Sequence, residues 1–166
     1  MSVLDRIAIV VLTVLAMEGL AWAIHRYVMH GWGWAWHKSH HRPRSGQFET
    51  NDLYALVFAG LAIVLFSLGR VYAPVLWWIG LGMTLYGVLY ALAHDGLVHR
   101  RIPGLPVPKR GYLLRLFEAH HLHHAVHSKV GAVSFGFLIA RDPAHLRKLL
   151  AERRARPQAA PIKQQA

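Results

Sequence analysis

Residues 75–99 read VLWWIGLGMTLYGVLYALAHDGLVH, an apolar run that ends in two histidines, His94 and His99. At about 1.5 Å per residue in a helix, the run from Val75 to Ala93 spans roughly 28 Å, close to the ~30 Å hydrocarbon core of a bilayer. The stretch therefore predicts a transmembrane helix that carries histidines at one end. Such a helix satisfies its own backbone polar groups, as a membrane-spanning segment must.

Two further apolar runs lie N-terminal to this one, at about residues 3–24 and 53–69, and the first is followed by His25 and His30. The composition agrees, because 54% of the residues are apolar and only 16% are charged. A soluble domain has about a quarter of its residues charged. We therefore expect an all-α integral membrane protein with three, or four, transmembrane helices.

The remaining segments indicate one domain and a tail. Residues 130–140 form a short apolar stretch that cannot cross a membrane by itself, and it either packs under the site or dips into the membrane interface. Residues 151–166 are rich in Arg, Ala, Pro and Gln. We expect residues 1–150 to form a single membrane-bound domain and residues 151–166 to be a disordered basic tail.

The chain is strongly basic, with 19 Lys and Arg against 8 Asp and Glu and a net charge of +11. Such an excess suits nucleic acid, an anionic membrane face or an acidic partner, but no nucleic-acid motif accompanies it, so we expect no nucleic acid. With three spanning helices, residues 25–52 and those after residue 93 share one side and hold four and thirteen Lys/Arg, leaving only Arg6 and Arg70 opposite. The positive-inside rule makes the rich side cytoplasmic.

All 13 histidines lie on this cytoplasmic side, and most of them follow two spacings. Residues three and four apart share a helix face, so a His-x2-His-His triple can direct three imidazoles at one point. Residues five apart lie about 140° apart on an α-helix, which suits a helix end that unwinds or two metals approached from two sides. The groups are His25/His30, His37/His40/His41, His94/His99 and His120/His123/His124, with His121 and His127 beside the last.

This number of imidazoles predicts two metal ions with about four or five ligands each, held in a histidine-rich cap. Imidazole suits Zn, Cu, Fe and Ni alike, and the absence of cysteine excludes thiolate ligands. A zinc hydrolase needs only three or four ligands and a carboxylate base. A pair of redox-active metal ions that activates O2 beside the membrane accounts for both the number of histidines and their position, although Zn can replace these ions in a purified sample.

Four acids lie where they can orient the imidazoles, as partners of metal ligands do. Asp95 and Glu118 adjoin histidine groups, and Asp52 begins the second apolar run on the same side. Glu18 lies within the first run, and an acid at membrane depth is a functional hypothesis. Snorkelling or a helix–helix hydrogen bond is the alternative for Glu18. We expect no special role for His145.

The sequence resembles the bacterial non-haem di-iron β-carotene 3-hydroxylases, members of the fatty-acid hydroxylase superfamily. The similarity covers about residues 5–142 and extends beyond the histidines, which desaturases, alkane hydroxylases and sterol oxidases also have. The strings that carry it are HRYVMHG (25–31), WHKSHH (36–41), NDLY (51–54), APVLWW (73–78), HDGLVH (94–99) and VSFGF (133–137).

The resemblance implies O2-dependent hydroxylation of carotenoid β-ionone rings at C3. β-Carotene would pass through cryptoxanthin to zeaxanthin, and ring-ketolated canthaxanthin would give astaxanthin. It further implies two iron ions, a carotenoid substrate taken from the membrane lipid, and a place in the bacterial cytoplasmic membrane. Electrons would come from an external ferredoxin-type system, which agrees with a chain that has no flavin or nicotinamide fingerprint.

The resemblance also implies a ligand set, with no catalytic residue beyond it. Members of the family usually have a basic residue other than histidine where this chain has His121. Either His120 or His121 is therefore the ligand there, and His121 and His127 are candidates for extra ligands. By position the ligands are His25, His30, His37, His40, His41, His94, His99, His120, His123 and His124.

Three other functions remain as alternatives. The same metal pair serves fatty-acid and sterol hydroxylases and desaturases. A histidine-rich membrane metal transporter would place histidines or carboxylates along a path within the membrane, whereas these groups lie beyond the helix ends. A bis-histidine haem protein would need only two to four histidines.

Overall fold

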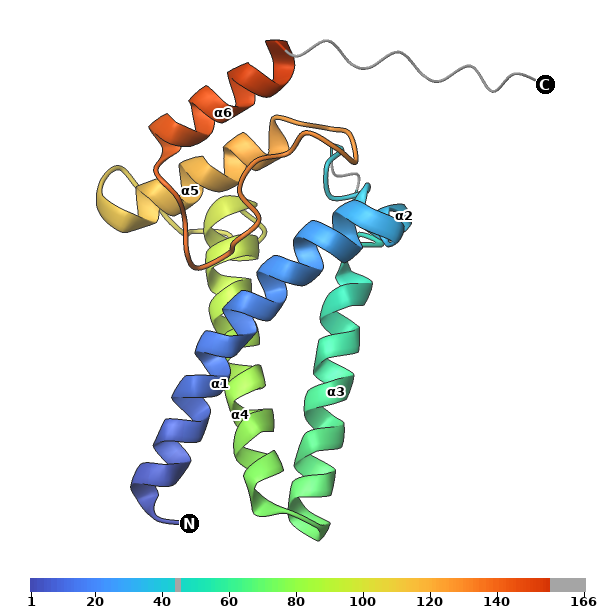
Figure 1. Cartoon of the computed structure of the whole chain (residues 1–166), viewed down its shortest axis with the longest axis vertical. Coiled ribbons are helices and arrows are strands. Elements are labelled where there is room, and N and C mark those ends of the chain that lie inside the picture. Colours follow the sequence, from blue (N-terminus) through green and yellow to red (C-terminus); the bar gives the residue numbers. More distant parts are fainter. Residues whose placement is uncertain (44–45, 156–166) are drawn as a thin grey trace, which may run out of the picture.

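The computed structural model describes residues 1–43 and 46–155, which form helices and loops without a strand. Three long helices lie at the end of the molecule that contains the N-terminus: α1 (Val3–Ala23), α3 (Asp52–Val71) and α4 (Pro74–Tyr90) (Figure 1). The helical stretches Val3–Trp32, Asp52–Val71 and Pro74–Val98 are long and apolar enough to cross a membrane. The predicted all-α membrane fold with three spanning helices is confirmed, and the described residues contain no fourth such helix.

Local chemistry explains where two of these helices begin. The Ser2 hydroxyl accepts the Asp5 N–H at 3.1 Å, and the Asp5 carboxylate accepts the Ser2 N–H at 2.7 Å. This capping box satisfies two N–H groups that the first turn of α1 leaves without partners. Pro74 opens α4, where the missing N–H of proline costs no helical hydrogen bond.

Two spanning helices continue past the apolar runs as π-helices. Helix α1 continues as η1 (Ile24–Trp32), and α4 continues as η2 (Ala91–Val98). The expected ends near residues 24 and 93 therefore mark a change of helix type rather than the end of a helix. A non-helical residue, Gly31, then bends the chain toward the short helix α2 (Trp34–His37).

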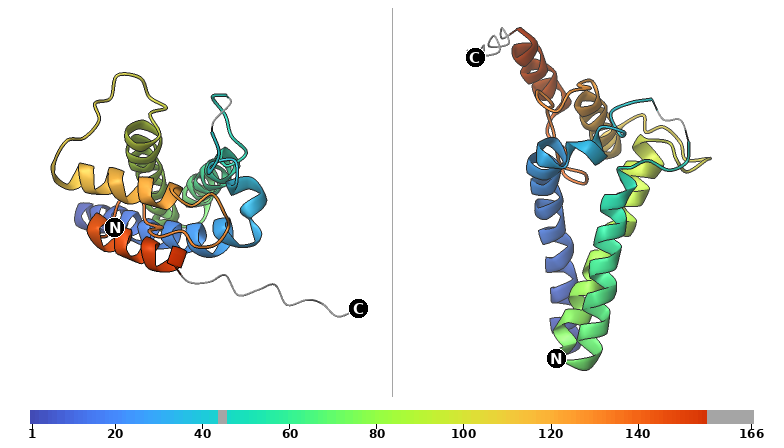
Figure 2. Two further views of the ribbon diagram at one scale, coloured as in Figure 1. Left: turned by 90° about the horizontal axis from the view of Figure 1, so that it is seen from above. Right: turned by 90° about the vertical axis from the view of Figure 1, so that its right-hand side faces the viewer.

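Helix α4 is the centre of the membrane-spanning part. It packs along both α1 and α3, whereas α1 and α3 do not pack along each other over the described residues (Figure 2). Gly82 permits the close approach of α1, because a Cβ on it would lie 2.6 Å from the Cβ of Thr13. Small residues commonly bring membrane helices together in this way. An apolar cavity of about 560 Å³ lies between α1, α3 and α4.

The other elements form a cap over one end of the three helices (Figures 1 and 2). The cap contains α2, α5 (Gly111–His124), α6 (Pro143–Ala155) and an irregular segment, residues 126–140. This segment includes the apolar residues 130–140, of which Val133 and Ala140 pack in the cap core and Phe137 packs against the spanning helices α1 and α4. The buried apolar core of the cap consists of Val98, Leu116, Ala119, Val133, Ala140, Leu146 and Leu150.

The C-terminal helix extends further than the composition predicted. Helix α6 ends at Ala155, so residues 151–155 are helical rather than disordered. The preceding turns bury Leu146 and Leu150 in the cap core, and the Arg153 guanidinium donates to backbone carbonyls at residues 131–132. The disorder expected for residues 156–166 lies outside the described residues.

Candidate metal centre

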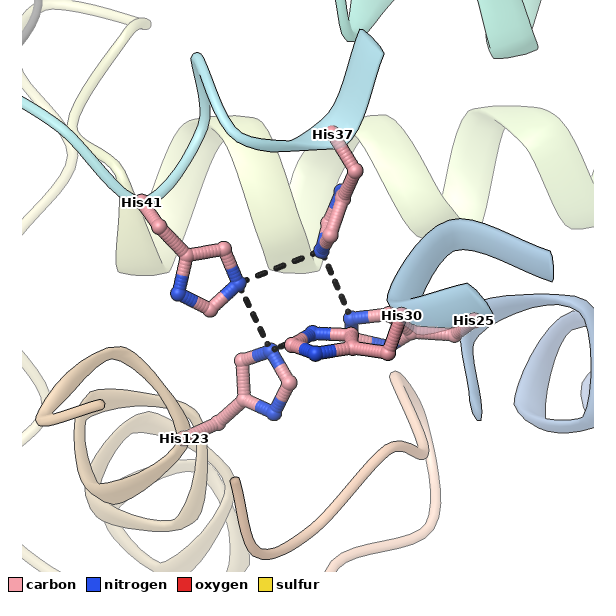
Figure 3. A group of neighbouring side chains, drawn as sticks. All are labelled: His25, His30, His37, His41 and His123. Atoms are coloured by element: carbon pink, nitrogen blue, oxygen red, sulfur yellow. Dashed lines mark hydrogen bonds between the residues drawn. The ribbon is translucent and has the colours of Figure 1, made fainter. Parts of the chain in front are cut away.

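Five buried histidines converge where η1 and α2 meet α5, and we call them the first group (Figure 3). One ring nitrogen from each lies within 4.8 Å of the corresponding nitrogen of every other. Two come from η1, one from the end of α2, one from the turn after α2 and one from α5. They are His25, His30, His37, His41 and His123.

The Nδ1 atom of each ring in the first group is bonded to an oxygen. Four of the five acceptors are backbone carbonyls of residues 126–135, and the fifth is the side chain of Asn51. A carbonyl oxygen only accepts, so Nδ1 carries the ring hydrogen and Nε2 carries a lone pair. The pairs are His25 with Phe135 O (2.9 Å), His30 with Lys129 O (2.9 Å), His41 with Val126 O (2.8 Å), His123 with Val133 O (3.2 Å) and His37 with Asn51 Oδ1 (2.7 Å).

These Nε2 atoms point at one another, without a hydrogen to share. The Nε2 of His37 lies 3.2 Å from that of His25 and 3.2 Å from that of His41. Lone pairs facing each other at this distance repel unless a cation lies between them. Two ligand atoms about 2.1 Å from one ion and at right angles to each other are about 3.0 Å apart. The first group therefore has the spacing and the protonation that one transition-metal ion requires.

A second group lies beside the first and consists of His40, His94, His99 and His120, whose ring nitrogens also lie within 4.8 Å of one another. The Nε2 atoms of His40 and His94 are 3.0 Å apart, and those of His99 and His120 are 3.1 Å apart. His124 adjoins this group, because its Nε2 lies 2.9 Å from that of His120. The His124 ring also stacks on His41 of the first group with 4.6 Å between ring centroids, so the two groups are in direct contact.

Carboxylates orient two rings of the second group. Nδ1 of His40 bonds to Glu49 at 3.1 Å, and Nδ1 of His94 bonds to Asp95 at 2.8 Å. Hydrogen bonds of this kind fix the orientation of an imidazole ligand and raise its basicity. Asp95 thus occupies the position expected of it from the sequence.

Arg101 connects the acids around the second group. Its guanidinium lies 2.9 Å from Glu49, 2.8 Å from Asp52 and 3.8 Å from Asp95. Hydrogen bonds to Asp52 and Glu49 raise the pKa of Arg101 above its usual value, although desolvation opposes them. Asp52 therefore reaches the histidines through Arg101 rather than by binding a ring.

The π-helices explain the five-residue spacing. A π-helix closes its hydrogen bonds between residues i and i+5, so residues five apart lie one above the other. His25 and His30 consequently enter the first group together, and His94 and His99 enter the second. The sequence left open a helix end that unwinds or two metals approached from two sides. The structure is nearer the first, because each helix widens into a π-helix, so the α-helical separation of about 140° does not apply.

The His-x2-His-His triples behave in the opposite way, since each is divided between the two groups. His37 and His41 belong to the first group, whereas His40 belongs to the second. In α5, His123 belongs to the first group and His120 to the second. The expectation that each triple directs three rings at one point is therefore wrong, because the turn after α2 and the winding of α5 turn adjacent rings toward different centres.

Burial keeps the rings of the cap neutral. Desolvation is the main cause that lowers the pKa of His37 to about 3, of His41 to about 4 and of His124 to about 2. The pKa values of His120 and His123 also lie well below the usual range for the same reason. Neutral imidazole is the form that binds metal.

Two histidines near the triple of α5 lie outside both groups. His121 is exposed, and its Nδ1 bonds to Phe117 O of its own helix at 2.9 Å. His127 is exposed beyond the end of α5 and borders a water-facing cavity. Between the two neighbours in α5, the structure directs His120 toward the other imidazoles and His121 away from them.

Like Asp52, two more of the acids expected to orient imidazoles, Glu118 and Glu18, have hydrogen-bond partners other than the rings. Glu118 pairs instead with Arg147 at 3.3 Å on the surface of the cap. Glu18 forms the helix–helix hydrogen bond that was its alternative, since it accepts the Tyr86 hydroxyl at 2.8 Å. Glu18 also binds backbone N–H groups of the cap, as described below.

A model of the fatty acid hydroxylase family matches residues 10–142, which include every histidine of the two groups. The chain belongs to the fatty acid hydroxylase family. No solved structure shows a significant match to it.

Named relatives support a narrower place within the fatty acid hydroxylase family. The chain is 60% identical over 149 residues to the beta-carotene hydroxylase of Pseudescherichia vulneris, covering 90% of this chain and 85% of the relative. It is 57% identical over 145 residues to the beta-carotene hydroxylase of Pantoea ananas, covering 87% of this chain and 83% of the relative. The beta-carotene 3-hydroxylase 1 of Arabidopsis thaliana, a chloroplastic protein, is 41% identical over 83% of this chain and 46% of its own length.

Several residues that orient the histidines were not predicted from the sequence. Glu49, Asn51 and Arg101 contact the rings or their carboxylate partners. Glu49 and Asn51 lie within twelve residues of the His37 triple, so their closeness in sequence was the only available indication. The carbonyls of residues 126–135 could not be found in this way, because every residue has a carbonyl.

Proposed function

We propose that this chain hydroxylates carotenoid β-ionone rings at C3, taking β-carotene through cryptoxanthin to zeaxanthin and canthaxanthin to astaxanthin. One observation carries the proposal: two groups of convergent Nε2 lone pairs lie directly beyond the polar end of an apolar cavity. The names of the bacterial and plant relatives, beta-carotene hydroxylase and beta-carotene 3-hydroxylase, support the substrate.

The apolar cavity suits a hydrocarbon that arrives from the bilayer. Its walls come from α1, α3 and α4, and they include Ile63 and Val88, which are exposed on the membrane-spanning surface. At the other end the cavity is bordered by Tyr90 and Phe137. Phe137 stacks on His25 with 4.8 Å between ring centroids, and Tyr90 stacks on His94 at 4.5 Å. A ring held at this end would lie next to the imidazoles while the polyene remains among the helices and lipid.

The reaction requires a ring C–H bond, O2, two electrons and two protons, and it yields C–OH and water. Iron held by the two histidine groups would supply the O2 activation, and the family is iron-dependent. Zn²⁺ fits the same nitrogen ligands but has no redox chemistry. This chain's share is to hold neutral imidazoles in place, to exclude water from the apolar cavity and to position the ring.

Electrons and protons would reach the histidines from the opposite, polar side. A second cavity of about 360 Å³ reaches the rings of His40, His99 and His124, and Arg42 and Arg101 also line it. Arg101 pairs there with Glu49, which also lines the cavity, so the feature that suits an acidic donor of the ferredoxin type is the surplus of Lys and Arg over this whole side of the chain. The surplus of Lys and Arg on this side supports a cytoplasmic position.

The test is to express the chain in bacterial cells that accumulate β-carotene and to separate the pigments by chromatography. We expect cryptoxanthin and zeaxanthin from the wild type. The control is an equally expressed His40→Ala, His123→Ala double variant, which removes one ring from each group and should leave β-carotene unchanged. Unconverted β-carotene in iron-supplied cells with abundant wild-type protein would exclude this substrate, and acyl lipids would then be tested.

A further inference from the structure

Glu18 is a buried carboxylate within a membrane-spanning helix. It lies in α1, seven residues before His25, and only 6% of its surface is exposed. No cation among the described residues forms an ion pair with it. An acid at membrane depth is costly unless polar groups replace its hydration.

The donors that replace this hydration come from the cap and from α4. One carboxylate oxygen, Oε1, accepts three consecutive backbone N–H groups, those of Phe137 (3.0 Å), Leu138 (3.0 Å) and Ile139 (2.9 Å). The other oxygen, Oε2, accepts the Tyr86 hydroxyl at 2.8 Å. Successive N–H groups that point at one spot form an anion-binding nest. In this chain the anion is a side chain from a distant part of the sequence.

The backbone segment that binds Glu18 also orients histidines of the first group. The same irregular segment, residues 126–140, supplies Phe135 O to His25 and Val133 O to His123. It has no helix of its own to fix its shape. The hydrogen bonds from residues 137–139 to Glu18 fasten it to α1, the helix that leads into His25 and His30.

Phe137 links this attachment to both histidine groups and to the apolar cavity. Its N–H binds Glu18, and its ring stacks on His25 at 4.8 Å and meets the His94 ring edge-on at 5.4 Å between centroids. The same ring borders the apolar cavity. The position of this aromatic ring, between the substrate space and the imidazoles, therefore depends on the Glu18 carboxylate.

Gly136 permits the close approach. A Cβ at this position would lie 2.5 Å from Ile139 O and 3.1 Å from Glu18 Oε1. The segment turns so tightly around the carboxylate that a side chain cannot be accommodated without a backbone shift. Glycine at position 136 is therefore required for the backbone to close around the Glu18 carboxylate.

We propose that Glu18 is a positioning residue, whose carboxylate fixes the backbone of residues 137–139 and thereby the rings of His25, His123 and Phe137. It touches neither metal nor substrate and acts through the segment that it binds. The inference rests on the proposed function in so far as it takes the first group to be a metal site.

The test is a Co²⁺ titration of the purified full-length chain in lipid nanodiscs, followed by optical absorption. Glu18→Gln keeps the shape and one acceptor oxygen but removes the charge. We expect it to weaken one of the two Co²⁺ equivalents by about 10- to 100-fold, the usual effect of losing a partner of metal ligands. The other equivalent should be weakened less, since the carbonyls of residues 126–135 hold four rings of the first group, whereas the second group meets this segment through contacts with the Phe137 ring.

Two further variants make the result specific. Tyr86→Phe removes a single donor to Glu18 and should weaken the same equivalent, but less. Glu118→Gln is the matched control, because it neutralises a carboxylate whose partner is the surface residue Arg147, and it should bind both equivalents like the wild type.

Equal weakening of both equivalents would indicate general loss of structure and overturn the proposal, as would unchanged binding in Glu18→Gln. The proposed function fails separately. A wild-type chain that binds Co²⁺ tightly but makes no hydroxylated carotenoid would end the carotenoid assignment and leave the role of Glu18 intact.

Discussion

His120 and His121 are neighbours in α5 with opposite surroundings, so they provide a matched pair of substitutions. His120 is buried, with its Nε2 3.1 Å from that of His99, whereas His121 is exposed and bonds to its own helix. We expect His120→Ala to lose about one metal equivalent per chain and nearly all product, because the second group loses a ligand. His121→Ala should keep metal and activity near wild-type levels. The measurement is the metal content of both purified variants. Equal loss of metal from the two would contradict the assignment of His120, rather than His121, as the ligand.

The buried histidines also set the acid stability of the fold. In the folded chain the pKa values of His37, His41 and His124 are about 3, 4 and 2, whereas an unfolded histidine titrates near pH 6.5. Below that pH the unfolded chain takes up protons that the folded chain excludes, so stability falls as the pH drops from about 6.5 toward 4. Each such histidine removes about 1.4 kcal/mol per pH unit in this window, and none above pH 7.

Melting temperatures of the detergent-solubilised protein between pH 8 and pH 4.5 measure this dependence. We expect a plateau above pH 7 and a steep decline below 6.5. His145→Gln changes an exposed histidine of α6 and should leave the curve in place. A melting temperature that stays constant to pH 5 would show that the rings are not held neutral.

At the scale of the element, the π-helices are the devices that bring histidines five residues apart into one group. Inserting one alanine between Val28 and Met29 would separate His25 from His30 by six residues, which neither an α- nor a π-helix places on one face. We expect the loss of about one metal equivalent, with the membrane-spanning part intact. An alanine inserted between Pro103 and Gly104, in a loop without regular structure, is the length-matched control. Full metal content in the η1 insertion variant would refute this role of the π-helix.

Elements were also the part of the fold that the sequence predicted best. The spanning helices follow from hydropathy and length alone, which is why α1, α3 and α4 lie within a few residues of the predicted runs. A helix end that unwinds was one of two arrangements left open, and the π-helical winding itself was not predicted, because the five-residue spacing of His94 and His99 does not determine how the backbone winds. The division of the triples depends on the turn after His37, a three-dimensional detail without a local pattern.

The residues that orient the histidines were harder to predict from the sequence than the spanning helices, because their partners are distant along the chain. Arg101 lies 49 residues from Asp52 in the sequence but 2.8 Å away in space. The sequence indicates that Glu18 is an acid at membrane depth, and a helix–helix hydrogen bond such as that from Tyr86 was an alternative, but its other partners are backbone N–H groups more than a hundred residues away. Because nearly every residue has a backbone N–H and every residue a C=O, residue type does not indicate which of these groups bind a side chain. Such contacts can be identified only in the folded structure.

At the scale of the whole molecule, the two histidine groups lie between an apolar and a polar environment. The apolar cavity approaches them from the membrane-spanning helices, and the polar cavity approaches them from the cap. The separation follows from the packing, because α4 holds α1 and α3 apart below the cap. Under the proposed function, an apolar substrate would approach the histidines from the spanning helices and a water-soluble electron donor from the cap.

This arrangement predicts that closing the apolar cavity stops turnover without disturbing the metals. Ala59 of α3 lines the cavity and is exposed on the helix surface, so a tryptophan there can occupy the space without displacing the core. We expect Ala59→Trp to reduce zeaxanthin formation at least about tenfold, because the indole is a large rigid group in the path of the polyene. Val57→Trp adds the same group on another face of α3, at an exposed residue that does not line the cavity, and should leave the pigment profile unchanged. Metal content should equal that of the wild type in both variants. Equal zeaxanthin from the two variants would mean that the substrate reaches the histidines by another route.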